Sequence, residues 1–321
     1  MIKYSIKRIM QMILVMLVVS VLVFMLTSLL GDPVSMLVPE NASEEEILAA
    51  QARLGLDKPL YAQYWIFLKD ALRGELGISY SYGQGAMGLI LERVPATMEV
   101  VVIAFLLTAL IAIPCGVYAG AFPERKSSRF IMSLSILGVS LPTFWIGMML
   151  VYIFAVSNQI LPASGRGEIG TFLGIHSSLF TVDGIRHLIM PSTTLAMAHI
   201  ASTIRLTRSG VIETMKEDYI KFVRSKGVGP GRTMFNHALK NALIPVVTVM
   251  GLNLGGMIAF TTITETIFAW PGMGKLLIDS INKADRPVIV AYLMVTAALF
   301  VVINFIVDIL YSLIDPRISL R

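Results

Sequence analysis

The stretch IMQMILVMLVVSVLVFMLTSLL, residues 9–30, decides the class of fold because almost all of its side chains are apolar. A bilayer core about 30 Å thick is crossed by about 20 mostly apolar residues in a helix. Basic residues precede the stretch, as in a secretory signal, but the apolar run exceeds a signal's usual length of about 7–15 residues and no A-x-A-like cleavage site follows. We therefore expect a retained first membrane span. Its polar residues are Gln11, Ser20, Thr27 and Ser28.

The composition of the chain agrees with a membrane protein. Of its 321 residues, 55% are hydrophobic and only 15% are charged, whereas soluble domains carry about 25% charged residues. The single cysteine, Cys115, excludes an internal disulfide framework and a Cys-based zinc site. The four histidines lie too far apart in the sequence to form a local ligand pair, so we expect no metal site.

Five further apolar stretches predict an all-α integral membrane protein with six transmembrane helices. The first span (9–30) stands apart from a single transmembrane domain, 97–313, which holds the other five. Between the spans we expect an extracytoplasmic helical segment at 31–96, a cytoplasmic segment at 207–241 and an extracytoplasmic loop at 265–287. The further spans are predicted at 97–121, 130–156, 187–206, 242–264 and 288–313.

The distribution of charge predicts the orientation. With the N-terminal residues 1–8 inside, the inner segments hold 16 Lys/Arg and 5 Asp/Glu. Long loops count little in the positive-inside rule, and without the long segment 31–96 the outer segments hold only 5 Lys/Arg. We expect both termini in the cytoplasm. The basic residues are thus concentrated on the inner side of the membrane. Because this accounts for the net charge of +5, we expect no nucleic-acid partner.

The outer segment 31–96 carries helix signals of its own. Ser43 followed three residues later by Glu46 forms a capping box, which predicts a helix that runs to Leu54. Pro59 then opens a second helix, and Gly74 ends it. The second helix has an apolar, aromatic stripe. Two roles remain open for this stripe: packing on the membrane surface or on other spans, and part of a docking surface for an external partner.

The inner segment 207–241 predicts two short amphipathic helices. Glycines at 227 and 229 break the first helix, and Pro230 suits the first position of the second. Periodicity alone leaves three interpretations: binding to anionic membrane lipid, plain structural packing, or insertion into a groove on a cytoplasmic protein.

Several motifs, in their order and spacing, give the chain a resemblance that covers nearly its whole length. DYIKFVRSKG and HALKNALIP resemble the coupling loop of ABC importer permeases. The whole set is similar to the first of the two permeases in the dipeptide/oligopeptide/nickel/glutathione group. The motifs are LGLDKPL (54–60), GELG (74–77), RVPAT (93–97), LPTFW (141–145), DYIKFVRSKG (218–227), HALKNALIP (237–245), ETIFAWPGMG (265–274) and DPR (315–317).

The resemblance implies a type I importer permease of the MetI-like architecture, in the inner membrane of a bacterium. It implies a second homologous permease, two ATP-binding subunits inside and a solute-binding protein outside. The family's coupling motif begins Glu-Ala-Ala, where this chain has Lys221, Phe222 and Val223, while Gly227 matches. The implied contact with the ATP-binding subunit comprises Asp218, Tyr219, Lys221, Phe222, Val223, Arg224, Lys226 and Gly227.

The stretch 242–264 offers candidates for contacts in the membrane. Gly251 and Gly255 form G-x-x-x-G, which lets helices approach closely. Two roles remain open for this contact: packing within the bundle, and an interface with a second permease. Polar residues of the same region line a substrate pathway or satisfy one another: Asn253, Thr261 and Thr262.

Catalytic motifs are missing from the sequence. The nearest approach to a phosphate-binding loop, around Gly274 and Lys275, lacks the first glycine and the Ser/Thr. We expect no catalysis and no cofactor in this chain, with ATP and Mg²⁺ bound by partner subunits. The alternative function is an ion-coupled secondary transporter, which would place ionisable or unwound segments at the midplane of two repeats.

Overall fold

The computed structural model describes residues 2–29, 43–54 and 57–314. The described chain is helical apart from a short antiparallel ribbon of β1 (Gly170–Phe172) and β2 (Ile175–Ser177), which confirms the all-α expectation. The helices are α1 (Ile2–Leu29), α2 (Glu44–Leu54), α3 (Leu60–Arg73), α4 (Ala86–Ala121), α5 (Lys126–Ser140), α6 (Thr143–Leu150), α7 (Val182–Thr214), α8 (Asp218–Ser225), α9 (Pro230–Arg232), α10 (Leu239–Ile267), α11 (Met273–Asn282) and α12 (Arg286–Ile314). Shorter helical turns are the π-helices Val151–Ser157 and Thr233–Ala238 and the 3-10 turn Ser178–Phe180.

Four helices of the described chain are long and apolar enough to cross a bilayer. They are α1 over Arg8–Leu26, α4, the run Pro230–Ile267 that includes α10, and α12 over Arg286–Ile309. The predicted fourth span lies in α7, which is 33 residues long but too polar to be counted with them. The total of six spans therefore stays a prediction.

The predicted third span, 130–156, is bent. Its two parts, Lys126–Gly138 and Thr143–Ser157, meet at an angle of 103°. A proline disfavours helical backbone in the residue before it, and Leu141, which precedes Pro142, is extended with φ −87° and ψ 131°. Counted together, the two parts raise the number of candidate spans to five.

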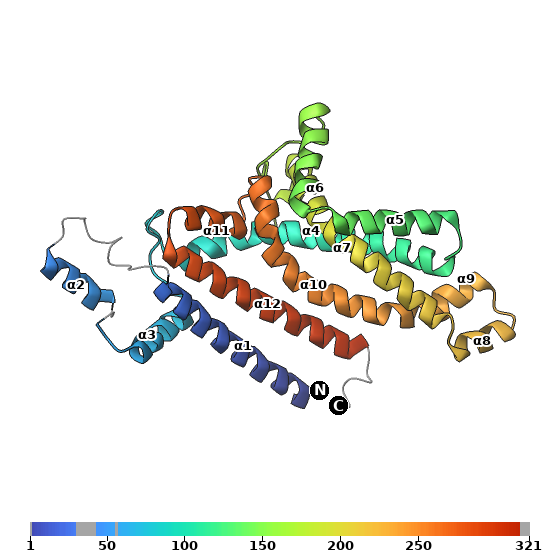
Figure 1. Cartoon of the computed structure of the whole chain (residues 1–321), viewed down its shortest axis with the longest axis horizontal. Helices are drawn as coiled ribbons and strands as arrows, with labels where there is room; N and C mark the ends of the chain where they lie inside the picture. Colours follow the sequence, from blue (N-terminus) through green and yellow to red (C-terminus); the bar gives the residue numbers. More distant parts are fainter. Residues whose placement is uncertain (1, 30–42, 55–56, 315–321) are drawn as a thin grey trace.

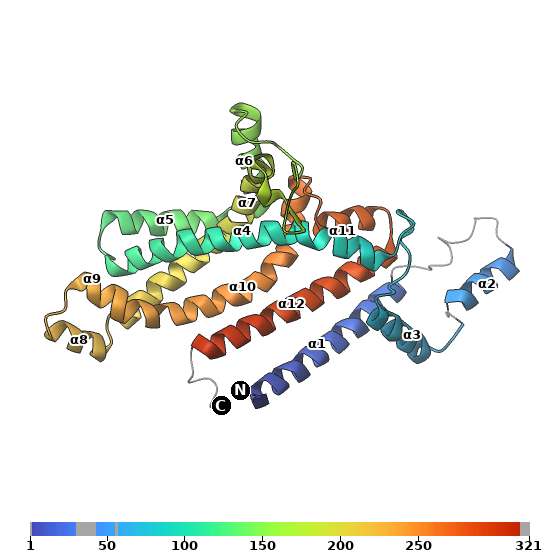
Figure 2. The same ribbon diagram turned by 180° about the vertical axis from the view of Figure 1, so that it is seen from behind.

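The two ends of the bundle differ. The start of α1 and the end of α12 lie toward the end that carries α8 and α9, whereas α2, α3 and α11 lie toward the opposite end (Figure 1). The reverse view gives the same arrangement (Figure 2). We name the end with α8 and α9 the elbow end, and the end with α2, α3 and α11 the outer end. At the elbow end, Arg8 and Asp308 form a salt bridge of 2.9 Å that joins α1 to α12.

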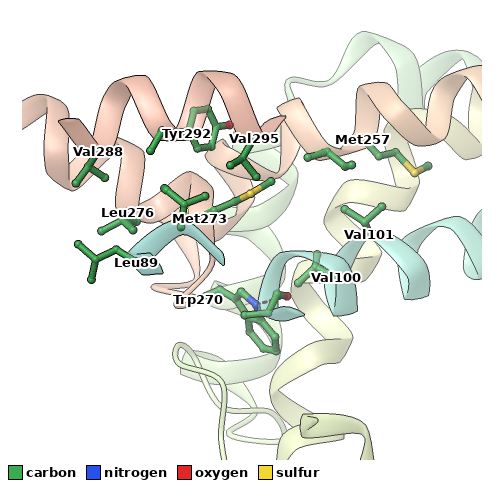
Figure 3. Packing of buried hydrophobic residues seen from close by; sticks show 14 of the residues in the cluster. Leu89, Val100, Val101, Met257, Trp270, Met273, Leu276, Val288, Tyr292 and Val295 are labelled. Atoms are coloured by element: carbon green, nitrogen blue, oxygen red, sulfur yellow. Dashed lines mark hydrogen bonds between the residues drawn. The ribbon is translucent and has the colours of Figure 1, made fainter. Parts of the chain in front are cut away.

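The main core gathers where α4, α11 and α12 meet the turn after α10. Trp270 is completely buried there, and its indole Nε1 donates a 2.8 Å hydrogen bond to the carbonyl of Ala96. Figure 3 shows Trp270 beside Val100, with side chains of α11 and α12 packed above them. This core fixes the outer end of α10 against α4.

Helices α4 and α7 approach each other closely because glycines remove side chains from the contact. A Cβ on Gly116 would lie 2.5 Å from the Cβ of Thr207, and one on Gly120 would lie 2.7 Å from the Cβ of Val211. Any larger residue at either position would push the helices apart. The contact between α7 and α4 is therefore tightly packed.

The helices of the outer segment follow the prediction, except that Pro59 lies at the N-cap of α3 and Leu60 is its first residue. Ser43 N–H donates to Glu46 Oε2 (2.9 Å) and Glu46 N–H donates to Ser43 Oγ (3.3 Å), which confirms the capping box. Gly74 ends α3 in the left-handed conformation, with φ 79°. Helix α3 packs on the outer end of α1, where Tyr64 Oη and Ser20 Oγ lie 2.9 Å apart.

A buried ion pair fastens the loop before α7 to α4. Arg166 donates two hydrogen bonds to the carboxylate of Glu99, from Nε (3.1 Å) and from Nη2 (2.6 Å). The hydroxyl of Ser178 donates to the same carboxylate, and so does the backbone N–H of Ser178 (3.2 Å). Both charged side chains are largely buried, so four donors hold the β1–β2 ribbon segment in place.

Candidate functional site

The candidate coupling site is a helical elbow between α7 and α10. Helix α7 ends at Thr214, α8 runs over Asp218–Ser225, and Gly227 turns the chain with φ 77°. A residue with a Cβ is strained in this left-handed conformation. Pro230 then occupies the first position of α9, as the sequence predicts. The eight predicted contact residues therefore lie together on α8 and its C-terminal turn.

Ile220 anchors α8 to the bundle. Its side chain is completely buried in a small cluster of its own, separate from the main core. The cluster joins α4, α7, α8 and the start of α10 through Val117, Val211, Ile220, Met234, Ala238 and Ala242. Burying an isoleucine contributes about 1.5–3 kcal/mol, so α8 is held in place before any partner binds.

A second link ties α8 to α10 by hydrogen bonds. Asn241 Nδ2 donates to Tyr219 Oη over 2.8 Å, and Tyr219 Oη donates to the carbonyl of His237 over 3.4 Å. Tyr219 thus faces the second half of the elbow with its hydroxyl. The elbow is therefore braced against both α7 and α10.

Two phenylalanine side chains of the elbow are exposed. Phe222 on α8 is 60% exposed and Phe235 is 64% exposed. Lys226 Nζ lies 4.5 Å from the centroid of the Phe222 ring, where the aromatic face attracts a cation. Val223 is half-buried, and Gly227 is open to solvent. An exposed aromatic side chain on a helix that is packed against the bundle suits insertion into a groove on another protein.

Charged residues flank Phe222 along α8. Asp218 and Lys221 form an exposed pair of 2.7 Å. The hydrogen bond from Lys221 lowers the pKa of the Asp218 carboxyl, and the same bond raises the pKa of the Lys221 ammonium. Both groups are charged at neutral pH, and their mutual stabilisation is lost as pH falls through the Asp218 pKa. Arg224 and Lys226 are exposed as well.

Replacing Ile220 by Ala should loosen the elbow without changing its outer surface. Truncation of a buried Ile or Leu costs about 2–5 kcal/mol, and the cost falls on the contact between α8 and the bundle. Hydrogen exchange of residues 218–225 should accelerate, while exchange in α4 and α12 stays unchanged. Equal protection of α8 in both proteins would contradict the anchoring role.

Sequence periodicity missed the inward role of Ile220 because it assigned the apolar face of this helix to Tyr219, Phe222 and Val223. The bend at 214–218 restarts the helix, so the face of α7 does not continue into α8. The spacing in the sequence groups Phe235 with Met234 and Ala238 on one apolar face of the second helix, but Met234 and Ala238 are buried and Phe235 is 64% exposed. The π-helical turn Thr233–Ala238 changes the register there.

The three predicted pathway residues do not share one face of α10. At about 100° per residue, Asn253 and Thr262 lie on opposite sides of the helix. Thr261 is completely buried and donates to the carbonyl of Ile258 (2.6 Å). Thr262 Oγ1 lies 3.0 Å from Tyr292 Oη on α12, and Asn253 is half-buried. A pathway role for any of them stays a prediction.

The G-x-x-x-G pair of α10 packs within the bundle. A Cβ on Gly251 would overlap Val307, and one on Gly255 would lie 2.8 Å from the ring of Phe300. Both neighbours belong to α12. The glycines therefore serve the contact between α10 and α12, one of the two roles that the sequence leaves open.

An apolar pocket of about 440 Å³ lies between α4, α10 and α12. Thr248 is its one polar lining residue, and its hydroxyl already donates to the carbonyl of Ile244 (2.9 Å). The lining of the pocket holds no charged side chain.

Residues 112–320 match the family described as "Binding-protein-dependent transport system inner membrane component". Residues 1–101 match the N-terminal part described for the same systems. The chain belongs to this family of permeases. The permease assignment accounts for the braced elbow, the apolar spans and the order of the sequence motifs together.

Known relatives cover nearly the whole permease. It is 40% identical over 315 residues to the "Di/tripeptide transport system permease protein DppB" of Pseudomonas aeruginosa, with 94% of each chain covered. It is 34% identical over 322 residues to the "Glutathione transport system permease protein GsiC" of Escherichia coli, with 100% of each chain covered. A solved structure, "Inward facing conformations of the MetNI methionine ABC transporter", is similar with a TM-score of 0.56 and 15% identity. That likeness covers 71% of this permease and 97% of the solved chain, and it supports the MetI-like fold.

Proposed function

We propose that this permease forms half of the translocation pathway of an ATP-binding cassette importer for di- or oligopeptides or a related small solute such as glutathione. The braced elbow with exposed Phe222 is the observation that carries the proposal. Its shape suits a groove on an ATP-binding subunit, and the family supplies the context of binding-protein-dependent transport. The names of DppB and GsiC relatives supply the class of solute.

The proposed assembly contains a second homologous permease, two ATP-binding subunits and an extracytoplasmic solute-binding protein, in contact with membrane lipid. This chain performs no catalysis and holds no cofactor in the proposal. ATP and Mg²⁺ act on the partner subunits. When the ATP-binding subunits close, each elbow is carried with them, and α7 and α10 follow because Ile220 and Tyr219 tie α8 to both.

ATP-driven uptake is the test. The permease is reconstituted in proteoliposomes with its partner permease, ATP-binding subunits and binding protein, and uptake of radiolabelled alanyl-alanine and glutathione is measured. Uptake should require ATP and the binding protein. Uptake driven by an ion gradient without ATP would support the secondary transporter instead, an alternative that the family match disfavours.

The proposed topology has six spans in the bacterial inner membrane, with both termini and the elbow in the cytoplasm. A Lys226→Cys variant in a Cys115→Ala background should react with an impermeant maleimide in inside-out vesicles only. Leu173→Cys, on the 86% exposed tip of the β1–β2 ribbon, should react in right-side-out vesicles only. Modification of Lys226→Cys in right-side-out vesicles would overturn the orientation.

A further inference from the structure

The outer end of α10 contains a buried carboxylate with no role in the elbow. Glu265 lies in the last turn of α10 and is completely buried. The ammonium of nearby Lys275 is bonded to Asp279 instead, over 2.7 Å. No ion pair to Glu265 is formed by residues 2–29, 43–54 or 57–314. Its partners are neutral hydrogen-bond donors.

These donors come from two other segments. Thr97 Oγ1, on α4, donates to Glu265 Oε1 over 2.6 Å. The backbone N–H of Lys275, at the start of α11, donates to Glu265 Oε2 over 2.9 Å. The Thr97 hydroxyl also accepts from the backbone N–H of Met273 over 2.9 Å. One carboxylate and one hydroxyl therefore join α4, α10 and α11.

Glycines bring the chain against this carboxylate. A Cβ on Gly272 would overlap Glu265 Oε1, and one on Gly274 would lie 3.0 Å from Oε2. The same turn forms two hydrogen bonds to α4. The Trp270 indole donates to the carbonyl of Ala96, and Arg93 Nη1 donates to the carbonyl of Pro271 over 3.3 Å. The motif ETIFAWPGMG thus folds tightly around its own first residue.

A buried carboxylate is an expensive way to pack helices. An apolar side chain would fill the space without the desolvation cost. Hydrogen bonds differ from apolar contacts because they fix direction and register. What Glu265 adds is a fixed orientation of three segments at the outer end.

The opposite end of the same helical run carries the elbow. The run Pro230–Ile267 passes from α9 to the last turn of α10, with Glu265 near one end and the Ile220 cluster at the other. Displacement of the elbow therefore arrives at Glu265 along one helix.

From this geometry we infer that Glu265 is a positioning residue that makes the outer ends of α4, α10 and α11 move as one body when the elbow is displaced. The inference rests on the proposed function. Without the Glu265 hydrogen bonds, the elbow still docks on the ATP-binding subunit and ATP is still hydrolysed. The outer ends of α4, α10 and α11 then follow the displacement of the elbow incompletely. Less solute is then transported for each ATP that is hydrolysed.

The test measures solute transported per ATP hydrolysed in the reconstituted complex, with radiolabelled alanyl-alanine and glutathione as the probes. Glu265→Leu should lower this ratio at least about fivefold, and Thr97→Val should lower it by a similar factor, since each removes a buried hydrogen bond. The double variant should be no worse than the more damaging single variant, because both changes break the same connection. Glu265→Gln keeps one acceptor oxygen and should restore part of the ratio.

Thr264→Val is the matched control. Thr264 is the completely buried neighbour of Glu265, and within the described part of the chain its hydroxyl has no hydrogen-bond partner. The substitution keeps the side-chain shape, so the ratio should stay at the wild-type value.

Two results would overturn the inference: an unchanged ratio in Glu265→Leu and Thr97→Val, or a fall in Thr264→Val as large as theirs. If transport and hydrolysis fall together with the amount of assembled complex, the ratio is unchanged and Glu265 is only structural. Absence of ATP-dependent uptake by the wild-type complex would instead refute the proposed function itself.

Discussion

Replacing Phe222 by Asp is expected to release the ATP-binding subunits from the assembled importer while the permease still inserts in the membrane. The ring stands 60% exposed on a helix that Ile220 already anchors, so its removal costs the permease itself little. The introduced aspartate loses the apolar contact with the groove and buries a carboxylate that has no counter-ion. Anchoring aromatic residues of interfaces are worth at least about 2 kcal/mol, or about 30-fold in affinity.

Co-purification in detergent measures the loss, with the amount of ATP-binding subunit per permease as the readout. Phe172→Asp is the matched control, because Phe172 has the same 60% exposure but lies on the β1–β2 ribbon, away from the elbow. It should leave retention unchanged. If Phe222→Asp retains its partner and transports normally, Phe222 is not part of the contact.

Arg166→Leu should cause the largest loss of stability of any single substitution considered for the outer end. The change leaves Glu99 buried without its bidentate partner, and breaking a buried ion pair in this way costs about 3–5 kcal/mol. The loss should appear as a lower thermal midpoint and as faster proteolysis within the segment 158–181. Both are measurable on the detergent-purified permease.

The second substitution Glu99→Leu should recover much of the stability lost in Arg166→Leu, because it removes the stranded charge. The surface pair of Arg129 and Glu124, at 3.2 Å and largely exposed, provides the contrast. Arg129→Leu should change stability by only about 0–1 kcal/mol. Equal effects of Arg166→Leu and Arg129→Leu would show that the Glu99 pair is not a structural fastening.

Local signals in the sequence were sufficient for much of the fold. Apolar runs predicted α1, α4, α10 and α12, because desolvation of a helix in a bilayer depends on composition over about 20 residues. Caps and breakers placed the ends of α2 and α3, since Ser43 and Gly74 act within one helical turn. The elbow was predicted for the same reason, from Gly227 and Pro230.

Contacts between distant segments were beyond the sequence. Glu99 and Arg166 lie 67 positions apart, and nothing in the charge pattern marks them as partners. Thr97 and Glu265 are 168 positions apart. The motif at 265–274 indicated a resemblance to a family, but it did not predict that Glu265 is buried or that it bonds to Thr97. The 103° bend at Leu141 and Pro142 was missed for a different reason: a hydropathy window averages over the stretch and does not register the proline that breaks the helix.

The salt bridge between Arg8 and Asp308 has a consequence for how the protein is made. Asp308 lies 300 positions after Arg8, so the arginine is synthesised well before its partner. The bond cannot form until Asp308 has been made, and a carboxylate inside a membrane without a counter-ion is costly. Helix α1 therefore supplies the counter-ion for α12, and the contact between these two helices forms after both have been synthesised.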